Sequence, residues 1–551
     1  MTPVLGRGLP LTLLLLAGAA AATDPLPAPA AAAAAWPADA KLEAQGARIG
    51  TVTVNIRPIF DPARPGERKA LFRLADRWHV DTRESTIRAQ LLFRPGDLFS
   101  RRVLDETERN MRDLRFIREP EIRVTGYRDG LVDLELLAHD VWTLNPGIAY
   151  GRAGGKDSAN ILLEELNLLG YGKHIAIDYS NDVDRSSYTL TWRDPNFGGT
   201  RWRDAITLQD SDDGSGGAIE LERPFYSLDT RWSTGLSLEH DDSIRSVYRL
   251  GHPIAEYRRD ALRGNLRYGW SGGLRGGWTR RGIVGIRRDE ARYAEVAGAT
   301  APAVLPADRR LIFPYLRIEA LQDDFDTTRN LDLIARTEDL VFGARYAVEL
   351  GWAAKAYGSD RDAAILRAEA SRGFRLRGGR SLFLAGSLAS RIEGGSPQDA
   401  LLAGELRFYR QTSPRGTFFA SLTGQTGHNL DADHELMLGG EDGLRGYPLR
   451  YQTGEARALL TIEQRIYTRR TIWKIADVGG AVFFDMGRTW GDSRFGPTEP
   501  RGTLKDIGFG LRLGNSRSAL GNVMHFDVAF PLDGDRTIDD VQLLVSTKRT
   551  F

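Results

Sequence analysis

Hydrophobic and polar positions alternate along most of this chain. From residue 144 to 551, segments of about ten residues carry apolar side chains at every second position, separated by turns rich in Gly, Asp, Asn and Pro. A period of two predicts β-strands that each have one apolar and one polar face. In the segment 458–466, Glu463 and Arg465 share the polar face. Further clear segments are 481–486, 507–513, 524–530 and 543–551.

Strands of this kind fit two architectures. In a soluble sandwich the apolar faces pack on each other, whereas in an outer-membrane barrel they meet lipid and the polar faces line a lumen. Charged side chains recur in mid-strand, and the last alternating strand closes on the aromatic Phe551. We therefore predict an all-β transmembrane barrel over residues 143–551. At roughly 25 residues per strand and connection, it holds about 16 antiparallel strands.

The residues before the barrel follow a different pattern. Residues 48–142 predict a small α/β domain of order β-α-α-β-β. Ser100 is suited to cap the second helix, and the turn at 128–130 joins the last two strands. The predicted elements are a strand at 49–56, helices at 82–92 and 101–116, and strands at 121–127 and 131–138.

The first 47 residues predict an exported precursor. Residues 1–22 combine Arg7, an apolar stretch at 9–16 and small residues suited to cleavage at 20–22, which is the pattern of a secretory signal peptide. Residues 23–47 are rich in Ala and Pro and predict a flexible linker.

Composition narrows the classes of function. The 551 residues carry a net charge of +1 and no cysteine, which argues against nucleic acid binding and excludes thiolate catalysis, disulfides and Cys-ligated metals. After the signal peptide, no run approaches the ~18 apolar residues of a membrane-spanning helix. Residues 269–273 match G-x-S-x-G, but a glycine-rich, strand-like stretch follows instead of a helix. We predict a protein that is not an enzyme, with no cofactor, catalytic or metal site.

Two motifs stand out from the alternation. Residues 438–448 read LGGEDGLRGYP, and their four glycines predict a loop in which the backbone approaches its neighbours closely. Arg445 lies between two of these glycines. On the strand at 481–486, Asp485 falls on the face turned away from lipid, where a carboxylate needs a cationic partner.

These motifs resemble the Omp85 superfamily of bacterial surface antigens, which includes BamA- and TamA-like proteins. Leu444-Arg445-Gly446-Tyr447 is similar to the family's (V/I/L)-R-G-(F/Y) loop motif. Phe484-Asp485-Met486-Gly487 is similar to its F-x-D-x-G strand motif, shifted in how the aromatic residues fall. Residues 164–172 and 194–197 resemble the early-barrel N-L-L-G-x-G and D-P-x-F segments. Five predicted strands after the loop match the family's number, and the small α/β domain resembles a single POTRA domain.

The resemblance implies a role for each motif. Arg445 would meet Asp485 inside the barrel and hold the loop in the lumen, which is also what an ordinary structural ion pair would do. Phe551 would belong to the C-terminal assembly signal. The implied lumen-loop lock comprises Gly443, Leu444, Arg445, Gly446, Tyr447, Asp485 and Gly487.

The resemblance also implies an outer-membrane protein whose POTRA domain lies in the periplasm. It would help client polypeptides to enter or cross the outer membrane without nucleotide hydrolysis. Its partners would be outer-membrane lipid, a periplasmic client and, in addition, a periplasmic accessory protein. The POTRA domain would either capture an extended chain at its sheet edge or only dock the barrel. A single POTRA domain departs from the many-module general insertase. A passive pore and a structural surface barrel remain the alternatives.

Overall fold

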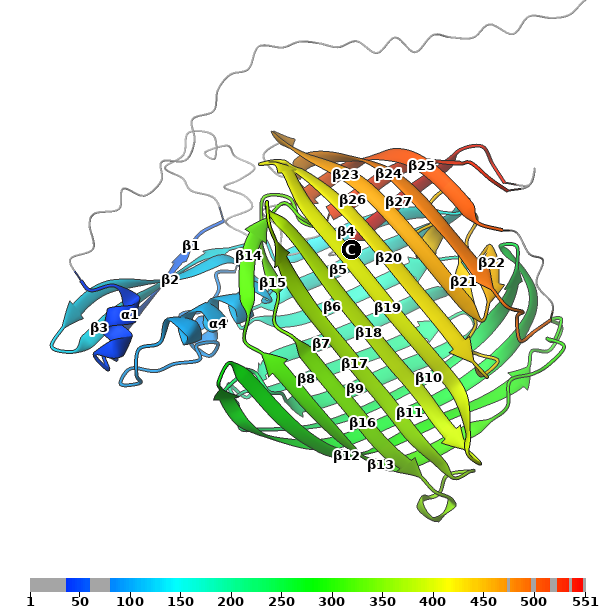
Figure 1. Ribbon diagram of the computed structural model, residues 1–551, viewed down its shortest axis with the longest axis horizontal. Helices are drawn as coiled ribbons and strands as arrows, with labels where there is room; N and C mark the ends of the chain where they lie inside the picture. Colours follow the sequence, from blue (N-terminus) through cyan, green and yellow to red (C-terminus); the bar gives the residue numbers. More distant parts are fainter. Residues whose placement is uncertain are drawn as a thin grey trace, which may run out of the picture.

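A wide barrel of strands carries a smaller domain at one end (Figure 1). This computed structural model describes residues 36–59, 80–472, 476–496, 502–515, 523–534 and 538–548. The predicted signal peptide at 1–22, most of the predicted linker and Phe551 lie outside the described residues. Among the helices in those ranges, none is long and apolar enough to cross a membrane.

The small domain contains a three-stranded mixed sheet. β1 (Arg48–Arg57) runs parallel to the central strand β3 (Leu131–Asp140), and β2 (Ile117–Arg128) pairs antiparallel with β3 on its other side. Asp129 and Gly130 both have positive φ and form the tight turn between β2 and β3. α3 (Glu84–Arg88) and α4 (Arg101–Arg112) lie between β1 and β2 in the chain, which is the predicted β-α-α-β-β order.

Both helices are shorter than predicted. The prediction of a helix at 82–92 is correct only over Glu84–Arg88, because the chain turns directly after Arg88 and Phe93 enters the core. The prediction at 101–116 is wrong after Arg112, where the chain turns towards β2. Ser100 occupies the N-cap position of α4 with extended backbone, but its side chain makes no capping hydrogen bond.

The predicted linker at 23–47 extends too far. α1 (Asp39–Ala44) lies within it, and Leu42 of this helix is fully buried in the core of the small domain. Ala47 is buried in the same core. The alanines and prolines around this segment predict a linker. One apolar side chain, Leu42, is nevertheless enough to anchor a short helix in the core.

Twenty strands of the described residues close into one antiparallel barrel. The predicted fold class is confirmed, but the predicted number of about 16 strands is wrong. Many connections are tight turns, such as Gly154 with Gly155 and Gly394 with Gly395, so that a strand and its connection take about 20 residues. The barrel strands are β4 (Leu144–Ala153), β5 (Lys156–Leu168), β6 (Lys173–Asn181), β7 (Ser186–Phe197), β8 (Trp202–Ser211), β9 (Gly214–Arg223), β10 (Trp232–Arg249), β11 (His252–Arg275), β12 (Trp278–Glu295), β13 (Arg309–Gln322), β16 (Arg345–Ala353), β17 (Ala363–Leu376), β18 (Arg380–Glu393), β19 (Ser396–Ser413), β20 (Gly416–His428), β23 (Ala456–Ile472), β24 (Ala476–Trp490), β25 (Leu504–Asn515), β26 (Val523–Pro531) and β27 (Gln542–Lys548).

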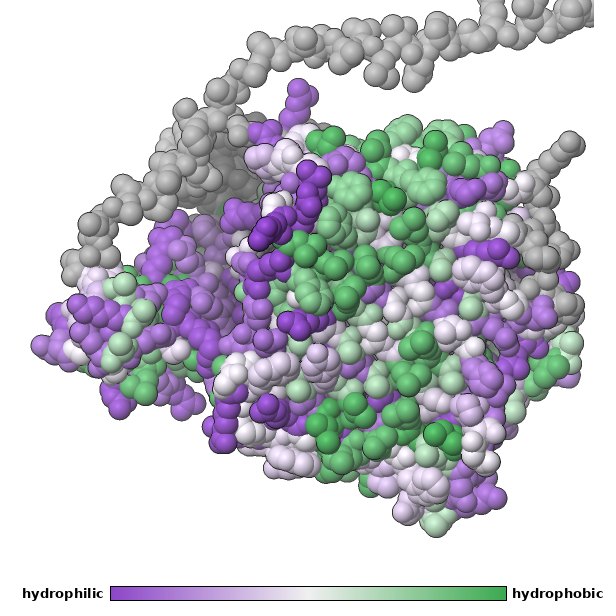
Figure 2. All heavy atoms as spheres, in the orientation of Figure 1, coloured by the Kyte–Doolittle hydropathy of each residue, from purple (hydrophilic) through white to green (hydrophobic). Residues whose placement is uncertain are grey.

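Side chains on the barrel wall divide by face as the alternation predicts. On β13 and β16, Ile318 and Val348 lie opposite each other, point outward and are 58% and 45% exposed. Glu349 points inward and is buried, and both Arg287 and Arg367 donate hydrogen bonds to it at 2.6 Å. Figure 2 shows hydrophobic residues gathered over the visible strands and polar residues over the small domain. An apolar outer surface of this extent suits lipid rather than water.

The barrel closes where its first and last strands meet. Over the described residues, Val545 of β27 and Arg152 of β4 form the single register pair of this junction. By contrast, β26 and β27 are paired continuously from Val523 opposite Lys548 to Ala529 opposite Gln542. The β27–β4 seam is therefore the least hydrogen-bonded junction of the described wall.

Two hairpins lie off the barrel wall. β14 (Phe325–Arg329) pairs with β15 (Thr337–Val341) in the connection between β13 and β16. β21 (Leu436–Leu438) pairs with β22 (Gln452–Gly454) in the connection between β20 and β23, which also contains the 3-10 helix η2 (Gly440–Asp442). A second 3-10 helix, η1 (Lys355–Tyr357), follows β16.

The small domain sits at the end of the barrel where β4 begins, called here the proximal end. In α4, Glu106 accepts a hydrogen bond from Leu228 N at 2.7 Å, and Asn110 donates one to Tyr226 O at 2.9 Å. Burial raises the pKa of Glu106. In α3, Thr86 donates to the backbone oxygen of Gly170 in the β5–β6 turn at 2.8 Å. These contacts hold the domain against the turns around the mouth of the lumen.

Candidate functional site in the barrel lumen

The connection between β20 and β23 enters the lumen from the distal end and is called here the lumen loop (429–455). Gly443 has a φ of 113°, a conformation that favours glycine. At Gly446, a Cβ atom would lie 2.6 Å from the Cβ of Asp506 on the wall, so only glycine lets the loop come this close. The two predicted glycines therefore bring the backbone around Arg445 against β25.

Arg445 binds three carboxylates on the inner wall. Its Nε and Nη2 donate to the two oxygens of Asp485 at 2.7 and 3.0 Å, which is the bidentate geometry that a guanidinium allows. Its Nη1 donates to Glu463 at 2.7 Å and to Asp527 at 3.3 Å. The guanidinium carbon also lies 3.4 Å from the centre of the Phe483 ring. The four neighbours come from β23, β24 and β26, so one side chain ties three strands to the loop.

Two more arginines complete this cluster, which we call the arginine network. Arg465 Nε donates to Glu463 at 2.8 Å, and Arg512 binds Asp527. Arg445, Arg465, Arg512 and their carboxylates are all less than a tenth exposed. Charges removed from water need full pairing. Glu463 and Asp527 are each shared between two arginines, whereas both oxygens of Asp485 bind Arg445. The network therefore holds the loop with strength but offers no free nucleophile or base.

The other residues of the predicted lock fill space around Arg445. Tyr447 is fully buried, and its hydroxyl donates to Lys505 O at 2.7 Å. Leu444 is fully buried in an apolar cluster of the loop and wall. At Gly487, a Cβ atom would lie 2.8 Å from Leu438 Cδ2, so the missing side chain leaves room for the loop.

The structure brings the predicted residues of the lumen loop together with Asp485 and Gly487. Sequence reasoning assigned Glu463 and Arg465 to the polar face but did not select them as partners of Arg445. It did not select Asp527 or Arg512 either. Alternation gives the face of a residue, whereas the height along the barrel that places Asp527 beside Arg445 depends on strand register.

The early-barrel motifs lie at the proximal end, away from the arginine network. Asn167, from the segment at 164–172, donates to Thr82 of the small domain at 2.8 Å. Asn196, from the segment at 194–197, receives a hydrogen bond from Gln90 of the same domain. Both motifs therefore help to dock the small domain on the barrel.

One acidic cluster lies at the distal end. Asp399, Asp431 and His434 place one ligand atom each within 4.8 Å of one another. Arg391 already binds Asp431 through two hydrogen bonds of 2.6 and 2.7 Å and lies 3.7 Å from Asp399. The hydrogen bond to Asp399 raises the pKa of the His434 imidazole. The arginine supplies the positive charge that a cation would bring, so these residues fit a structural cluster.

Several solved outer-membrane proteins are similar to this structure. BamA from Haemophilus ducreyi lacking POTRA domains 1–3 has 14% identity over 91% of this chain and 84% of its own, with a TM-score of 0.36. CdiB from Acinetobacter baumannii has 13% identity over 91% and 73%, with a TM-score of 0.44. The alcaligin receptor FauA from Bordetella pertussis has 11% identity over 75% and 73%, with a TM-score of 0.34. No protein-family model and no curated protein sequence matches the chain.

Proposed function

We propose that this chain is an Omp85-type outer-membrane protein that helps client polypeptides to insert into or cross the outer membrane. In this proposal the proximal end faces the periplasm, the small domain acts as a single POTRA domain, and lipid surrounds the barrel. A periplasmic client is the main partner, with an accessory periplasmic protein as a further one.

One observation carries the proposal. The loop motif around Arg445 lies inside the barrel and binds Asp485 of the strand motif, which is the pairing that the Omp85 resemblance implies. Two further features support it. The small domain is held at the mouth of the lumen, where an incoming chain would first arrive. The β27–β4 seam is weakly paired, so its exposed strand edges could accept a client strand.

The proposed mechanism needs no chemical step. A client segment would add to an edge of the small domain's sheet, through backbone hydrogen bonds, and then reach the lumen or the seam. The arginine network would keep the lumen loop in place while the seam opens. Free energy would come from the client's own strand pairing and apolar burial in lipid, which is why no nucleotide is required.

Depletion of the protein from cells tests this proposal. We expect a defined set of outer-membrane or surface-exposed proteins to fall several-fold, measured by quantitative mass spectrometry of the envelope. A copy with Arg445→Ala should fail to restore them. Arg263→Ala is the matched control, because Arg263 also faces the lumen but forms a half-exposed pair with Glu239 at 3.1 Å.

The alternatives give different results. A passive pore would leave protein abundances unchanged while the uptake of small solutes falls after depletion. A structural surface barrel would change neither quantity. Either result would reject the insertion or translocation proposal.

A further inference from the structure

One connection at the proximal end is much longer than a barrel requires. Turns at the periplasmic end of outer-membrane barrels are short. The connection between β13 and β16 instead folds into the β14–β15 hairpin. Its tip, residues 330–336, enters the lumen, because Leu331 and Ile334 are buried there against Tyr409 and Tyr467 of the wall.

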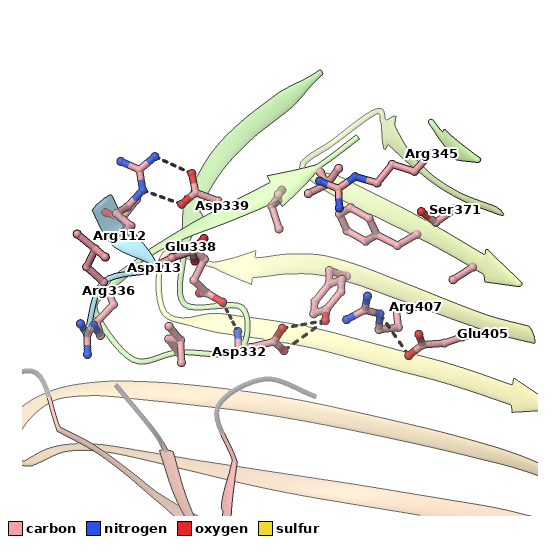
Figure 3. Close-up of a pocket in the computed structure, with 18 of the residues that line it drawn as sticks. Arg112, Asp113, Asp332, Arg336, Glu338, Asp339, Arg345, Ser371, Glu405 and Arg407 are labelled. Carbon is pink, nitrogen blue, oxygen red and sulfur yellow. Dashed lines mark hydrogen bonds and ion pairs between the residues drawn. The ribbon is translucent and has the colours of Figure 1, made fainter. Parts of the chain in front are cut away.

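The hairpin is fastened to the small domain. Arg112 of α4 binds Asp339 of β15 through two hydrogen bonds of 2.7 and 2.6 Å, drawn as dashed lines in Figure 3. Glu119 of β2 accepts hydrogen bonds from Arg329 at 2.8 Å and from Thr337 N at 3.1 Å. The Arg112 and Asp339 side chains are only 15% and 20% exposed, so this pair is stronger than a surface ion pair.

The tip of the same hairpin is fastened to the arginine network. Arg465 Nη1 donates to Asp332 and to Leu331 O, both at 2.8 Å. Arg465 Nε donates to one oxygen of Glu463, and the other oxygen of Glu463 accepts from Arg445 at 2.7 Å. A continuous chain of ion pairs therefore runs from the hairpin tip to the lumen loop.

The cavities place the hairpin and the loop at two ends of one space. A cavity of 470 Å³ at the mouth is lined by Arg112 of α4 and by Glu338 of the hairpin. A cavity of 710 Å³ further along the lumen is lined by Asp442 of the lumen loop. The two cavities adjoin, since both are lined by Arg345, Ser371, Ala385 and Glu405.

We infer that the β14–β15 hairpin is a strap through which the small domain controls the lumen loop. When the domain holds Asp339, the tip holds Arg465, and Arg465 shares Glu463 with Arg445. When the domain moves away, the tip withdraws, Arg465 loses Asp332, and the shared hydrogen bonds of Glu463 redistribute. Coupling of this kind requires an element with two arrangements. The hairpin is seated in the structure, and the withdrawn arrangement is the one we infer. The inference concerns the resting barrel and does not depend on any client.

Spin labels test the strap in the purified full chain, reconstituted in lipid vesicles. The chain has no cysteine, so Thr327→Cys on the hairpin and Glu441→Cys on the lumen loop each accept one nitroxide. Both positions are exposed. We expect Arg112→Ala to raise the mobile fraction of the spectrum about 10-fold at Thr327, with a smaller rise at Glu441. Arg123→Ala is the matched control, because Arg123 lies in the same domain and pairs with Glu121, away from the hairpin.

A double-mutant cycle tests the relay itself. Asp332→Asn weakens the link to Arg465 in advance, so adding Arg112→Ala to it should still release Thr327 but should leave the Glu441 spectrum unchanged. The charge reversal Arg112→Asp with Asp339→Arg should restore both spectra, which guards against a folding defect. The strap is rejected if Thr327 becomes mobile while Glu441 stays fixed in Arg112→Ala, or if the two substitutions act additively at Glu441.

Discussion

At the scale of single residues, the buried charge of the lumen converges on Arg445. It binds Asp485 with two nitrogen atoms and reaches Glu463 and Asp527 with the third, while Phe483 covers its face. A planar guanidinium can donate two parallel hydrogen bonds to one carboxylate and still reach others. A lysine ammonium supplies the charge but not this bidentate geometry. Loss of the cation would leave Asp485, which has no exposed surface, without its main partner.

We therefore expect Arg445→Ala to lower the free energy of unfolding by about 3–5 kcal/mol and Arg445→Lys to have a smaller effect. Urea unfolding in lipid vesicles, followed by tryptophan fluorescence, measures both. The double variant Arg445→Ala with Asp485→Ala should lose less than the sum of the single variants, because it removes the unpaired acid as well. Strict additivity would show that the two residues act independently.

Only some of the residues around Arg445 could be predicted from the sequence. Arg445 could be selected because glycines isolate it, and Asp485 because a carboxylate on the inner face needs a cation. Asp527 and Phe483 look like many other inward residues. Their place beside Arg445 comes from the register of three strands that are far apart in sequence, which alternation does not specify.

At the scale of elements, the β14–β15 hairpin behaves as an inserted unit with its own buried acid. Glu338 accepts hydrogen bonds from Leu331 N at 2.8 Å and Asp332 N at 2.9 Å, and thereby shapes the tip. Burial and the charge of Asp332 raise the pKa of Glu338 to about 7. No sequence signal separated this hairpin from barrel strands, because residues 325–341 read as two short polar strands around a turn.

The raised pKa gives the hairpin a pH dependence with a defined sign. Seated Glu338 keeps its proton up to about pH 7, whereas a released glutamate loses it near its usual pKa of about 4.3. Seating is therefore most favourable below about pH 4.3 and weakens as the pH rises to about 7, by on the order of 3–4 kcal/mol. The nitroxide at Thr327 should be more mobile at pH 8 than at pH 5.

Glu338→Gln isolates this effect. Glutamine does not titrate and keeps only one of the two oxygens that accept hydrogen bonds from Leu331 N and Asp332 N. The mobility at Thr327 should therefore start higher than in the unmodified chain but become independent of pH in this range. A nitroxide at the exposed Thr300, in a distal connection, corrects for general effects of pH. An unchanged pH dependence in Glu338→Gln, or a less mobile label at pH 8, would contradict the assignment to Glu338.

At the scale of the whole molecule, the described part of the wall closes at the β27–β4 seam, where a single register pair joins the two strands. The prediction of a barrel rested on alternation and succeeded, since Ile318 and Val348 do face outward. The strand number failed because tight turns at both ends shorten each repeat, and a sequence does not mark whether a polar stretch is a turn or a loop. The Omp85 resemblance implies a weak seam between the first and last strands. The alternation of each strand does not indicate it, because the pairing involves residues almost 400 positions apart.

Amide hydrogen exchange should reveal the seam. In detergent micelles we expect the amides of β4 and β27 to exchange at least about 10-fold faster than those of β25, which is paired on both sides. An oxidised pair of Val545→Cys with Arg152→Cys should slow exchange in β4. The same crosslink between Val528→Cys and Leu543→Cys, within the continuous β26–β27 pairing, should leave β4 unchanged. Equal protection of β4 and β25 without a crosslink would show that the seam is closed.

The interleaving of arginines with carboxylates along the inner wall has a consequence for transit. Glu349 lies between Arg287 and Arg367, as Glu463 does between Arg445 and Arg465. In these two clusters the opposite charges lie about 3 Å apart, well within the screening length of about 8 Å at physiological salt, so each arginine acts on its surroundings together with an acid. Along these parts of the lumen, an acidic segment and a basic segment would meet similar electrostatic resistance. For a client that crosses the lumen as proposed, selection by charge would then have to take place at the mouth.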